Sequence, residues 1–129
     1  MRLLLVDDEP SLRRSLRRIC EARGIEVVGE AGDGKEGVAL ASALRPDCIV
    51  IDMRMPGMDG IEATRLIKKA LPDAVVVMLS AYDDASLHSE AADAGVAQWF
   101  LKGESARHLC DRLQTLVAQC LGVAPPAQL

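Results

Sequence analysis

Two hydrophobic patterns alternate along the chain. Short apolar runs that stop at a polar residue predict strands, at 3–6, 48–52, 74–79 and 96–101, with a shorter mixed strand at 25–29. Between them, apolar residues recur at helical spacing, which predicts helices at 11–23, 33–45, 59–71, 83–95 and 105–120. Asp33 with Glu36 and Asp59 with Glu62 have capping-box spacing at two of the helix starts.

This alternation predicts an α/β fold, because parallel strands need helical crossovers between them. We expect a three-layer α/β/α sandwich of five strand–helix units. The uniformly apolar first, third and fourth strands suit the centre of a sheet, and the mixed second and fifth strands suit its edges. The order 2-1-3-4-5 satisfies both conditions. We expect one domain over 1–121, followed by a linker or loose end at 122–129.

Composition narrows the functional classes. Half of the 129 residues are apolar, and Tyr82, Trp99 and Phe100 are the only aromatic residues, so the core must be largely aliphatic. A net charge of −4 argues against direct nucleic-acid binding by this segment. The sequence has no apolar run long enough for a membrane span and no secretory signal. Its four cysteines lack metal-binding spacing and suit a core in a reducing cytoplasm, where we expect the protein to reside.

Polar residues end four of the five predicted strands. In a parallel sheet these ends share one edge, which would gather Asp7, Asp8, Asp52, Ser80 and Lys102. Three carboxylates placed together repel one another unless a cation joins them, and Mg²⁺ prefers such oxygen ligands. A hydroxyl and an ammonium would complete a cradle for a tetrahedral anion. Asp52, at the end of the central strand, is then placed to form an aspartyl-phosphate.

Each of these residues alone has an ordinary structural explanation. An acid pair after a strand often caps a helix, a serine often lies in a turn, and a lysine is often a solvated charge. Their occurrence together at one edge favours a site.

Four segments carry a resemblance to a known family: Leu5-Val6-Asp7-Asp8-Glu9, 52–60, Leu79-Ser80-Ala81 and Leu101-Lys102. They resemble the receiver domain of two-component response regulators, the CheY-like family, which has a flavodoxin-like fold. The resemblance covers about residues 1–121. It implies a signalling switch that catalyses only its own phosphorylation and dephosphorylation, rather than an enzyme acting on other substrates.

The resemblance also implies roles for the site residues. Asp52 would accept a phosphoryl group from a phosphohistidine on a sensor histidine kinase or a histidine phosphotransfer protein. Asp8, Asp52 and the main-chain carbonyl of Arg54 would bind Mg²⁺, with Asp7 acting through water. Ser80 and Lys102 would contact the phosphoryl group, and the small Ala81 would leave it room to enter.

Two positions depart from the family pattern. Trp99 stands where the family usually has Tyr or Phe as a switch residue, and Gly103 stands where Pro commonly follows the lysine. The segment Lys102-Gly-Glu-Ser105 resembles the branch in which a helix-turn-helix DNA-binding domain follows the receiver. In such a transcription regulator, we expect the output surface, or a homodimer, to form on the helix 83–95, the strand 96–101 and the last helix.

Three other functions are possible alternatives to this one. The segment 32–37 fits the G-x-G-x-x-G dinucleotide pattern, but Asp33 would point a carboxylate at the pyrophosphate, and the glycines suit a turn before a helix. A phosphatase of the haloacid dehalogenase type needs a second Asp where Arg54 stands. A receiver-like interaction module that is never phosphorylated would be expected to lack an acid, the hydroxyl or the lysine.

The first helix also carries a basic face, formed by Arg13, Arg14, Arg17 and Arg18. This face is either a solvated surface or a docking patch for an acidic partner.

Overall fold

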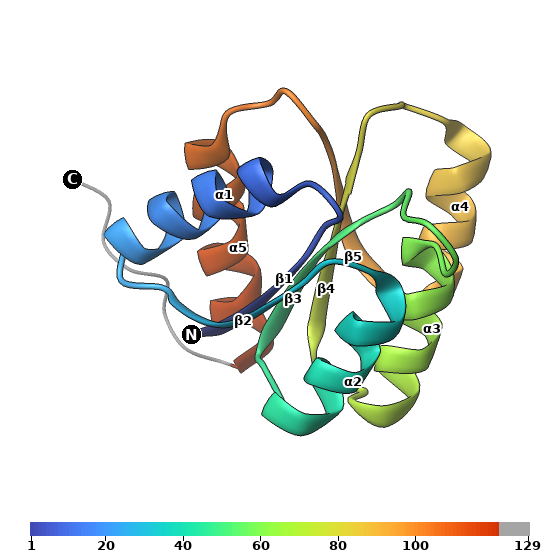
Figure 1. Cartoon of the computed structure of the whole chain (residues 1–129), viewed down its shortest axis with the longest axis horizontal. Coiled ribbons are helices and arrows are strands. Elements are labelled where there is room, and N and C mark those ends of the chain that lie inside the picture. The colour runs from blue at the N-terminus through green and yellow to red at the C-terminus, as the bar shows by residue number, and fades with distance from the viewer. Residues whose placement is uncertain (122–129) are drawn as a thin grey trace.

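The computed structural model describes residues 1–121, in which strands and helices alternate as the pattern predicts (Figure 1). The strands are β1 (Arg2–Val6), β2 (Glu26–Ala31), β3 (Cys48–Asp52), β4 (Val75–Ser80) and β5 (Val96–Leu101). The helices are α1 (Pro10–Ala22), α2 (Gly34–Leu44), α3 (Gly60–Ala70), α4 (Ala85–Ala94) and α5 (Ala106–Leu121). The linker expected at 122–129 lies outside the described residues.

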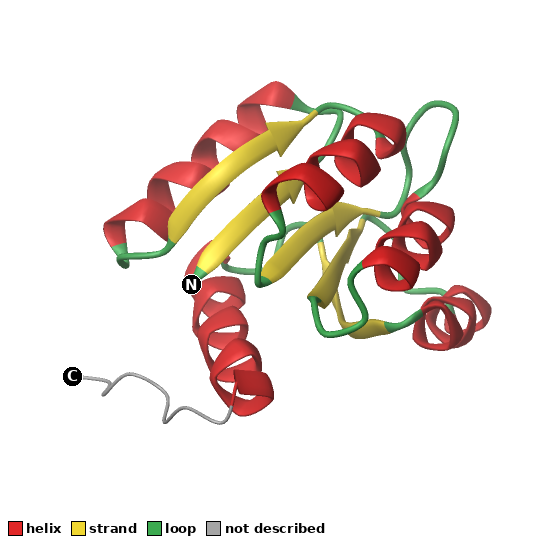
Figure 2. Cartoon of the chain, turned by 90° about the horizontal axis from the view of Figure 1, so that it is seen from below, coloured by secondary structure: helices red, strands yellow, loops and turns green. Residues whose placement is uncertain are grey.

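All strand pairs are parallel, and the sheet order is β2-β1-β3-β4-β5, which confirms the expected topology. Helices α1 and α5 cover one face of the sheet, and α2, α3 and α4 cover the other (Figures 1 and 2). This is the three-layer arrangement. It places β3 in the centre, so the strand that ends at Asp52 has a hydrogen-bonded neighbour on each side.

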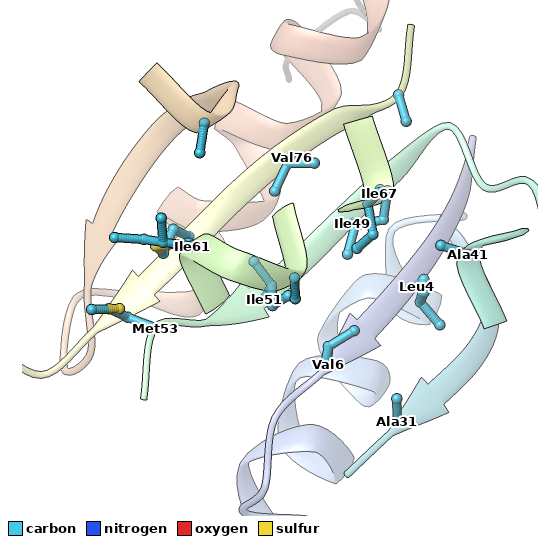
Figure 3. Close-up of a cluster of buried hydrophobic side chains, with 14 of the residues drawn as sticks. Leu4, Val6, Ala31, Ala41, Ile49, Ile51, Met53, Ile61, Ile67 and Val76 are labelled. Carbon is cyan, nitrogen blue, oxygen red and sulfur yellow. The ribbon is translucent and has the colours of Figure 1, made fainter. Parts of the chain in front are cut away.

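Each face of the sheet has its own hydrophobic core, because successive side chains of a strand point to opposite faces. Leu4, Val6, Ile49, Ile51 and Val76 point toward α2, α3 and α4 (Figure 3). The alternate residues point toward α1 and α5, among them Leu3, Leu5, Val50, Val75 and Val77. Burial on both faces explains why these strands are continuously apolar rather than alternating.

The helix starts follow the predicted caps. Asp33 Oδ1 accepts from the Glu36 amide, and Asp59 Oδ1 accepts from the Glu62 amide, both at 2.8 Å. Asp84 caps α4 by accepting from the Ser86 and Leu87 amides. These bonds satisfy amides that the first turn of a helix leaves without a partner.

Several predicted boundaries differ from the structure by one or two residues, and two elements show the cause. Helix α1 begins at Pro10 rather than Ser11, since proline suits the first helical position. Strand β2 begins at Glu26 and runs to Ala31, two residues beyond the predicted end, because Glu30 and Ala31 pair with Leu5 and Val6 of β1.

The glycine pattern at 32–37 has a packing explanation. A Cβ atom on Gly37 would lie 2.9 Å from a methyl carbon of Val6, and one on Gly34 would lie 2.8 Å from the Met58 carbonyl oxygen. These two glycines therefore let α2 approach β1 and the loop before α3. This packing role adds to the turn before the helix that the sequence predicts.

Candidate functional site

The carboxyl edge of the sheet brings the predicted acids together. Asp7 and Asp8 follow β1, and Asp52 ends β3. One carboxylate oxygen from each of the three lies within 4.8 Å of the others. Asp7 and Asp52 are each only 3% exposed, whereas Asp8 is exposed to solvent. The edge is thus an acidic site with one side open.

The start of α3 packs directly beneath Asp52. The Met53 amide donates to the Leu79 carbonyl, and the Gly60 amide donates to the Met53 carbonyl, both at 2.8 Å. A Cβ atom on Gly60 would collide with the Asp52 carbonyl oxygen and lie 3.0 Å from the Met53 Cα. Only glycine allows this approach, which fixes the backbone of the acid residue.

Lys102 provides a positive charge in the site. Its Nζ lies 3.1 Å from Asp52 Oδ2 and 3.4 Å from Asp7 Oδ2. The Lys102 amide donates to the Ser80 carbonyl at 2.7 Å, which ties the end of β5 to the end of β4. Burial alone would lower the pKa of Lys102, but the hydrogen bond and charge of Asp52 outweigh it and raise the pKa. The lysine is therefore held as an ammonium.

The two buried acids are difficult to ionise together. Burial, then the charge of Asp7, raises the pKa of Asp52 to about 6, although Lys102 acts in the opposite direction. Burial also raises the pKa of Asp7, against a hydrogen bond from the Glu9 amide. Within residues 1–121, Asp7 Oδ2 receives no hydrogen bond. Three carboxylates with one ammonium leave two negative charges, which suits a divalent cation.

Ser80 is buried beside the acids at the end of β4, and its Oγ accepts from the Tyr82 amide at 3.1 Å. Ala81, the next residue, is exposed. The Arg54 amide lies 3.3 Å from Asp52 Oδ1, and the Arg54 guanidinium lies 5.4 Å from the centre of the Tyr82 ring. The role of the Arg54 carbonyl stays a prediction.

Trp99 lies apart from the acid cluster. It pairs with Met78 in the sheet, packs against the core on the α4 side and stacks on His88, with ring centroids 4.2 Å apart. Among the described residues, no acceptor reaches its indole nitrogen. Trp99 thus links β5 to α4, and no local sequence pattern indicates its partner His88.

Sequence reasoning missed a structural role for Arg13. Its guanidinium donates to the Asp7 carbonyl and lies 3.3 Å from Glu30 Oε1, while Arg17 lies 2.7 Å from Glu30 Oε2. Half of the basic face is therefore paired with β2 and the acid-bearing loop, and Arg14 and Arg18 remain exposed. Glu30, a charged residue directly after the strand predicted at 25–29 and within β2 in the structure, was the available signal.

None of the helices described within residues 1–121 is long and apolar enough to cross a bilayer.

Comparison with known proteins identifies the family. The model of the response regulator receiver domain matches residues 3–114. The transcriptional regulatory protein LiaR of Bacillus subtilis is 41% identical over 115 residues, which cover 88% of this chain and 54% of LiaR. The response regulator protein VraR of Staphylococcus aureus is 40% identical, with coverage of 88% and 55%. The chain spans about half the length of these curated relatives.

Solved structures agree with this comparison. The signal receiver domain of the putative response regulator NarL from Mycobacterium tuberculosis has a TM-score of 0.85 at 31% identity, covering 90% of this chain and 94% of that one. A LuxR-family two-component response regulator from Aurantimonas has a TM-score of 0.86 at 33% identity, covering 92% and 85%. The chain therefore belongs to the response regulator receiver domain family.

Proposed function

We propose that Asp52 accepts a phosphoryl group from a phosphohistidine on a sensor histidine kinase or a histidine phosphotransfer protein. The observation that supports this most directly is the pairing of Asp52 with Lys102 at 3.1 Å, beside two further acids whose oxygens lie within 4.8 Å. A carboxylate nucleophile, a cation and an unbalanced negative charge are what phosphoryl transfer with a divalent metal requires.

The acid cluster fits Mg²⁺ as the metal. Three carboxylate oxygens that lie within 4.8 Å of one another could share one divalent cation, directly or through water. We assign Asp8, Asp52 and the Arg54 carbonyl as direct ligands and Asp7 as a ligand through water. Bound there, Mg²⁺ would neutralise negative charge on the phosphoryl oxygens.

The protein's own residues account for the transfer step. A carboxylate oxygen of Asp52 bonds to phosphorus as the phosphorus–nitrogen bond of the phosphohistidine breaks, and the electron pair returns to the imidazole. The Lys102 ammonium, already directed at Asp52, would pair with a phosphoryl oxygen. The Ser80 hydroxyl would donate to another, and Ala81 is too small to block entry. Water later hydrolyses the acyl phosphate, so the domain catalyses only its own phosphorylation and dephosphorylation.

Ser80 connects this chemistry to the output surface. Movement of Ser80 toward the phosphoryl group would vacate space beside β5, and Trp99 with its partner His88 would follow. We infer that the changed surface comprises α4, β5 and α5, and that it supports a homodimer. By analogy with LiaR, whose name is that of a transcriptional regulatory protein, we propose a cytoplasmic regulator with a DNA-binding output domain beyond the receiver domain at 1–121, joined by a linker at 122–129.

Intact-mass spectrometry with acetyl phosphate as donor tests the proposal. We expect one phosphoryl adduct that requires Mg²⁺ and disappears in Asp52→Asn. Asp73→Asn serves as the matched control, because Asp73 is exposed in the loop before β4, far from the acid edge, and it should keep the adduct. If no adduct forms under any condition, the unphosphorylated interaction module becomes the better description. An adduct that persists in Asp52→Asn would reject Asp52 as the acceptor.

A further inference from the structure

Two buried cysteines lie against each other between α1 and α5. The Sγ atoms of Cys20 and Cys110 are 3.3 Å apart, although the residues are 90 positions apart in the sequence. Their exposed fractions are 1% and 0%. The phosphorylation chemistry uses neither residue, and they lie on the face of the sheet opposite α2, α3 and α4.

The helices that carry the pair are fixed relative to each other. α1 packs against α5 in the same core. Arg23, which follows α1, pairs with Asp111, the residue after Cys110. A disulfide has an S–S length of about 2.05 Å, so the sulfurs need to approach by only about 1 Å. The ion pair beside them favours that approach over separation of the helices.

The two thiols differ in acidity. The hydrogen bond from Cys20, with help from the charge of Arg23, lowers the pKa of Cys110. The same hydrogen bond, followed by burial, raises the pKa of Cys20. Cys110 is therefore the thiol that ionises first, and a thiolate is the nucleophile in oxidation by peroxides.

We propose that Cys20 and Cys110 form a redox site in which a peroxide oxidises the two thiols to a reversible disulfide joining α1 to α5. The Cys110 thiolate attacks one peroxide oxygen, the O–O bond breaks, and a sulfenic acid forms. The departing hydroxide takes up the proton that the Cys110 thiol released and becomes the first water. The Cys20 sulfur then attacks the sulfenic sulfur, the S–S bond forms, and the departing hydroxide takes the Cys20 proton as a second water. The thiols lose two electrons and hydrogen peroxide gains them.

The disulfide would close a loop that contains most of the fold. The loop it closes contains β2, α2, β3, α3, β4, α4 and β5. Closing a loop of this length restricts the unfolded chain, so oxidation should raise the melting temperature. The bond should not block Asp52 phosphorylation by acetyl phosphate, because neither sulfur lies in the acid cluster.

Peptide mapping gives a direct test, because trypsin places each cysteine in a separate peptide. Cys20 falls in 19–23, Cys110 in 108–112, Cys48 in 36–54 and Cys120 in 113–129. The whole chain is treated with hydrogen peroxide, then denatured in N-ethylmaleimide and digested. We expect the peptides 19–23 and 108–112 to appear as one bridged species that dithiothreitol separates, and the melting temperature to rise by at least about 5 °C.

Cysteine variants provide the controls. Cys20→Ala and Cys110→Ala should abolish both the bridge and the rise in melting temperature. Cys48→Ala, which removes another buried cysteine of the same core, should keep both. Refolding the reduced chain in a glutathione redox buffer gives the oxidant access even if the native core excludes it.

The proposal is overturned if Cys20 and Cys110 still react with N-ethylmaleimide after peroxide treatment of the folded chain, even where oxidative refolding forms the bridge. A bridge to Cys48 or Cys120 instead, or a bridge that leaves the melting temperature unchanged, would also reject it. Since no step involves Asp52, these outcomes are separate from success or failure of the phosphorylation experiment.

Discussion

Asp52 is buried beside a second acid, so the residue that would carry the chemistry also works against folding. The lysine compensates only in part, because it is shared with Asp7. Gly60 also matters to the site through a single atom. Because it has no Cβ, the start of α3 can pack directly beneath the backbone of Asp52.

In the absence of divalent cations, ionisation of Asp52 should lower the free energy of unfolding. A raised pKa means that the folded state binds more protons between 3.8 and about 6, so stability falls as pH rises through that window. We expect Asp52→Asn to be more stable than wild type by about 1–2 kcal/mol at pH 7.5, after allowing for the lost Lys102 contact. Urea unfolding in EDTA measures this, and the difference should vanish below about pH 4. A less stable Asp52→Asn at pH 7.5 would contradict the assignment.

A methyl group at Gly60 should disturb the acid directly. We expect Gly60→Ala to lower stability by about 1–3 kcal/mol through overpacking and to slow phosphorylation of Asp52. Gly24→Ala is the control: its φ of +79° imposes backbone strain, but none of the described atoms lies within 4 Å of the added methyl. Both variants should lose stability in urea, and only Gly60→Ala should slow adduct formation. Equal phosphorylation rates would mean that the close approach does not position Asp52.

At the scale of secondary-structure elements, α1 both covers the sheet and positions the loop that bears Asp7 and Asp8. Its first turns hold the loop that bears the acids, because Arg13 donates to the Asp7 carbonyl while Glu30 of β2 holds Arg13 and Arg17. The hydrogen bond from Arg17 lowers the pKa of Glu30, so this carboxylate stays ionised at neutral pH. Helix, edge strand and loop thus form one polar network beside the site.

Loss of Arg13 should weaken magnesium binding. Arg13→Met keeps much of the aliphatic stem but removes the donor to the Asp7 carbonyl, and a hydrogen bond of about 1 kcal/mol corresponds to roughly fivefold in affinity. Calorimetric titration with Mg²⁺ measures the change. Arg14→Met removes an equal charge from an exposed position of the same helix and should leave the affinity within about twofold. If both variants lose similar magnesium affinity, the loss comes from the change in net charge and not from the hydrogen bond of Arg13.

The elements that sequence predicts best are those with local causes. Asp33, Asp59 and Asp84 cap their helices because the acceptor and the amides it satisfies are close in sequence. The acids, Ser80 and Lys102 could be placed on one edge because parallel topology leaves no alternative. The end of β2 and the role of Arg13 depend on Glu30, whose partners are 13 and 17 residues away. The stacking of His88 on Trp99 likewise depends on how α4 sits against β5, which no local pattern encodes.

At the scale of the whole molecule, the centre of the sheet and the helices that cover it differ in how deeply they are buried. β3 is buried throughout and paired on both sides. α4 has only two buried residues, Ala91 and Ala94, and both have small side chains. Within the proposed output surface, α4 therefore has little apolar area to lose when it moves.

Hydrogen exchange should resolve this difference. We expect amides of α4 to exchange at least about tenfold faster than those of β3, because local opening of α4 exposes little apolar surface. α3 is the control helix, since it packs on the same face and buries Ile61, Ile67 and Thr64. It should exchange more slowly than α4. Equal protection of α3 and α4 would argue against α4 as the mobile element.

Lys102 follows β5, whereas the acids follow β1 or end β3, and this order has a consequence for biosynthesis. A ribosome adds about 5–20 residues per second, so Asp52 is made on the order of several seconds before Lys102. During that interval the nascent chain carries all three carboxylates without the ammonium that later joins two of them. Cations of the surrounding solution therefore reach these carboxylates before Lys102 has been made.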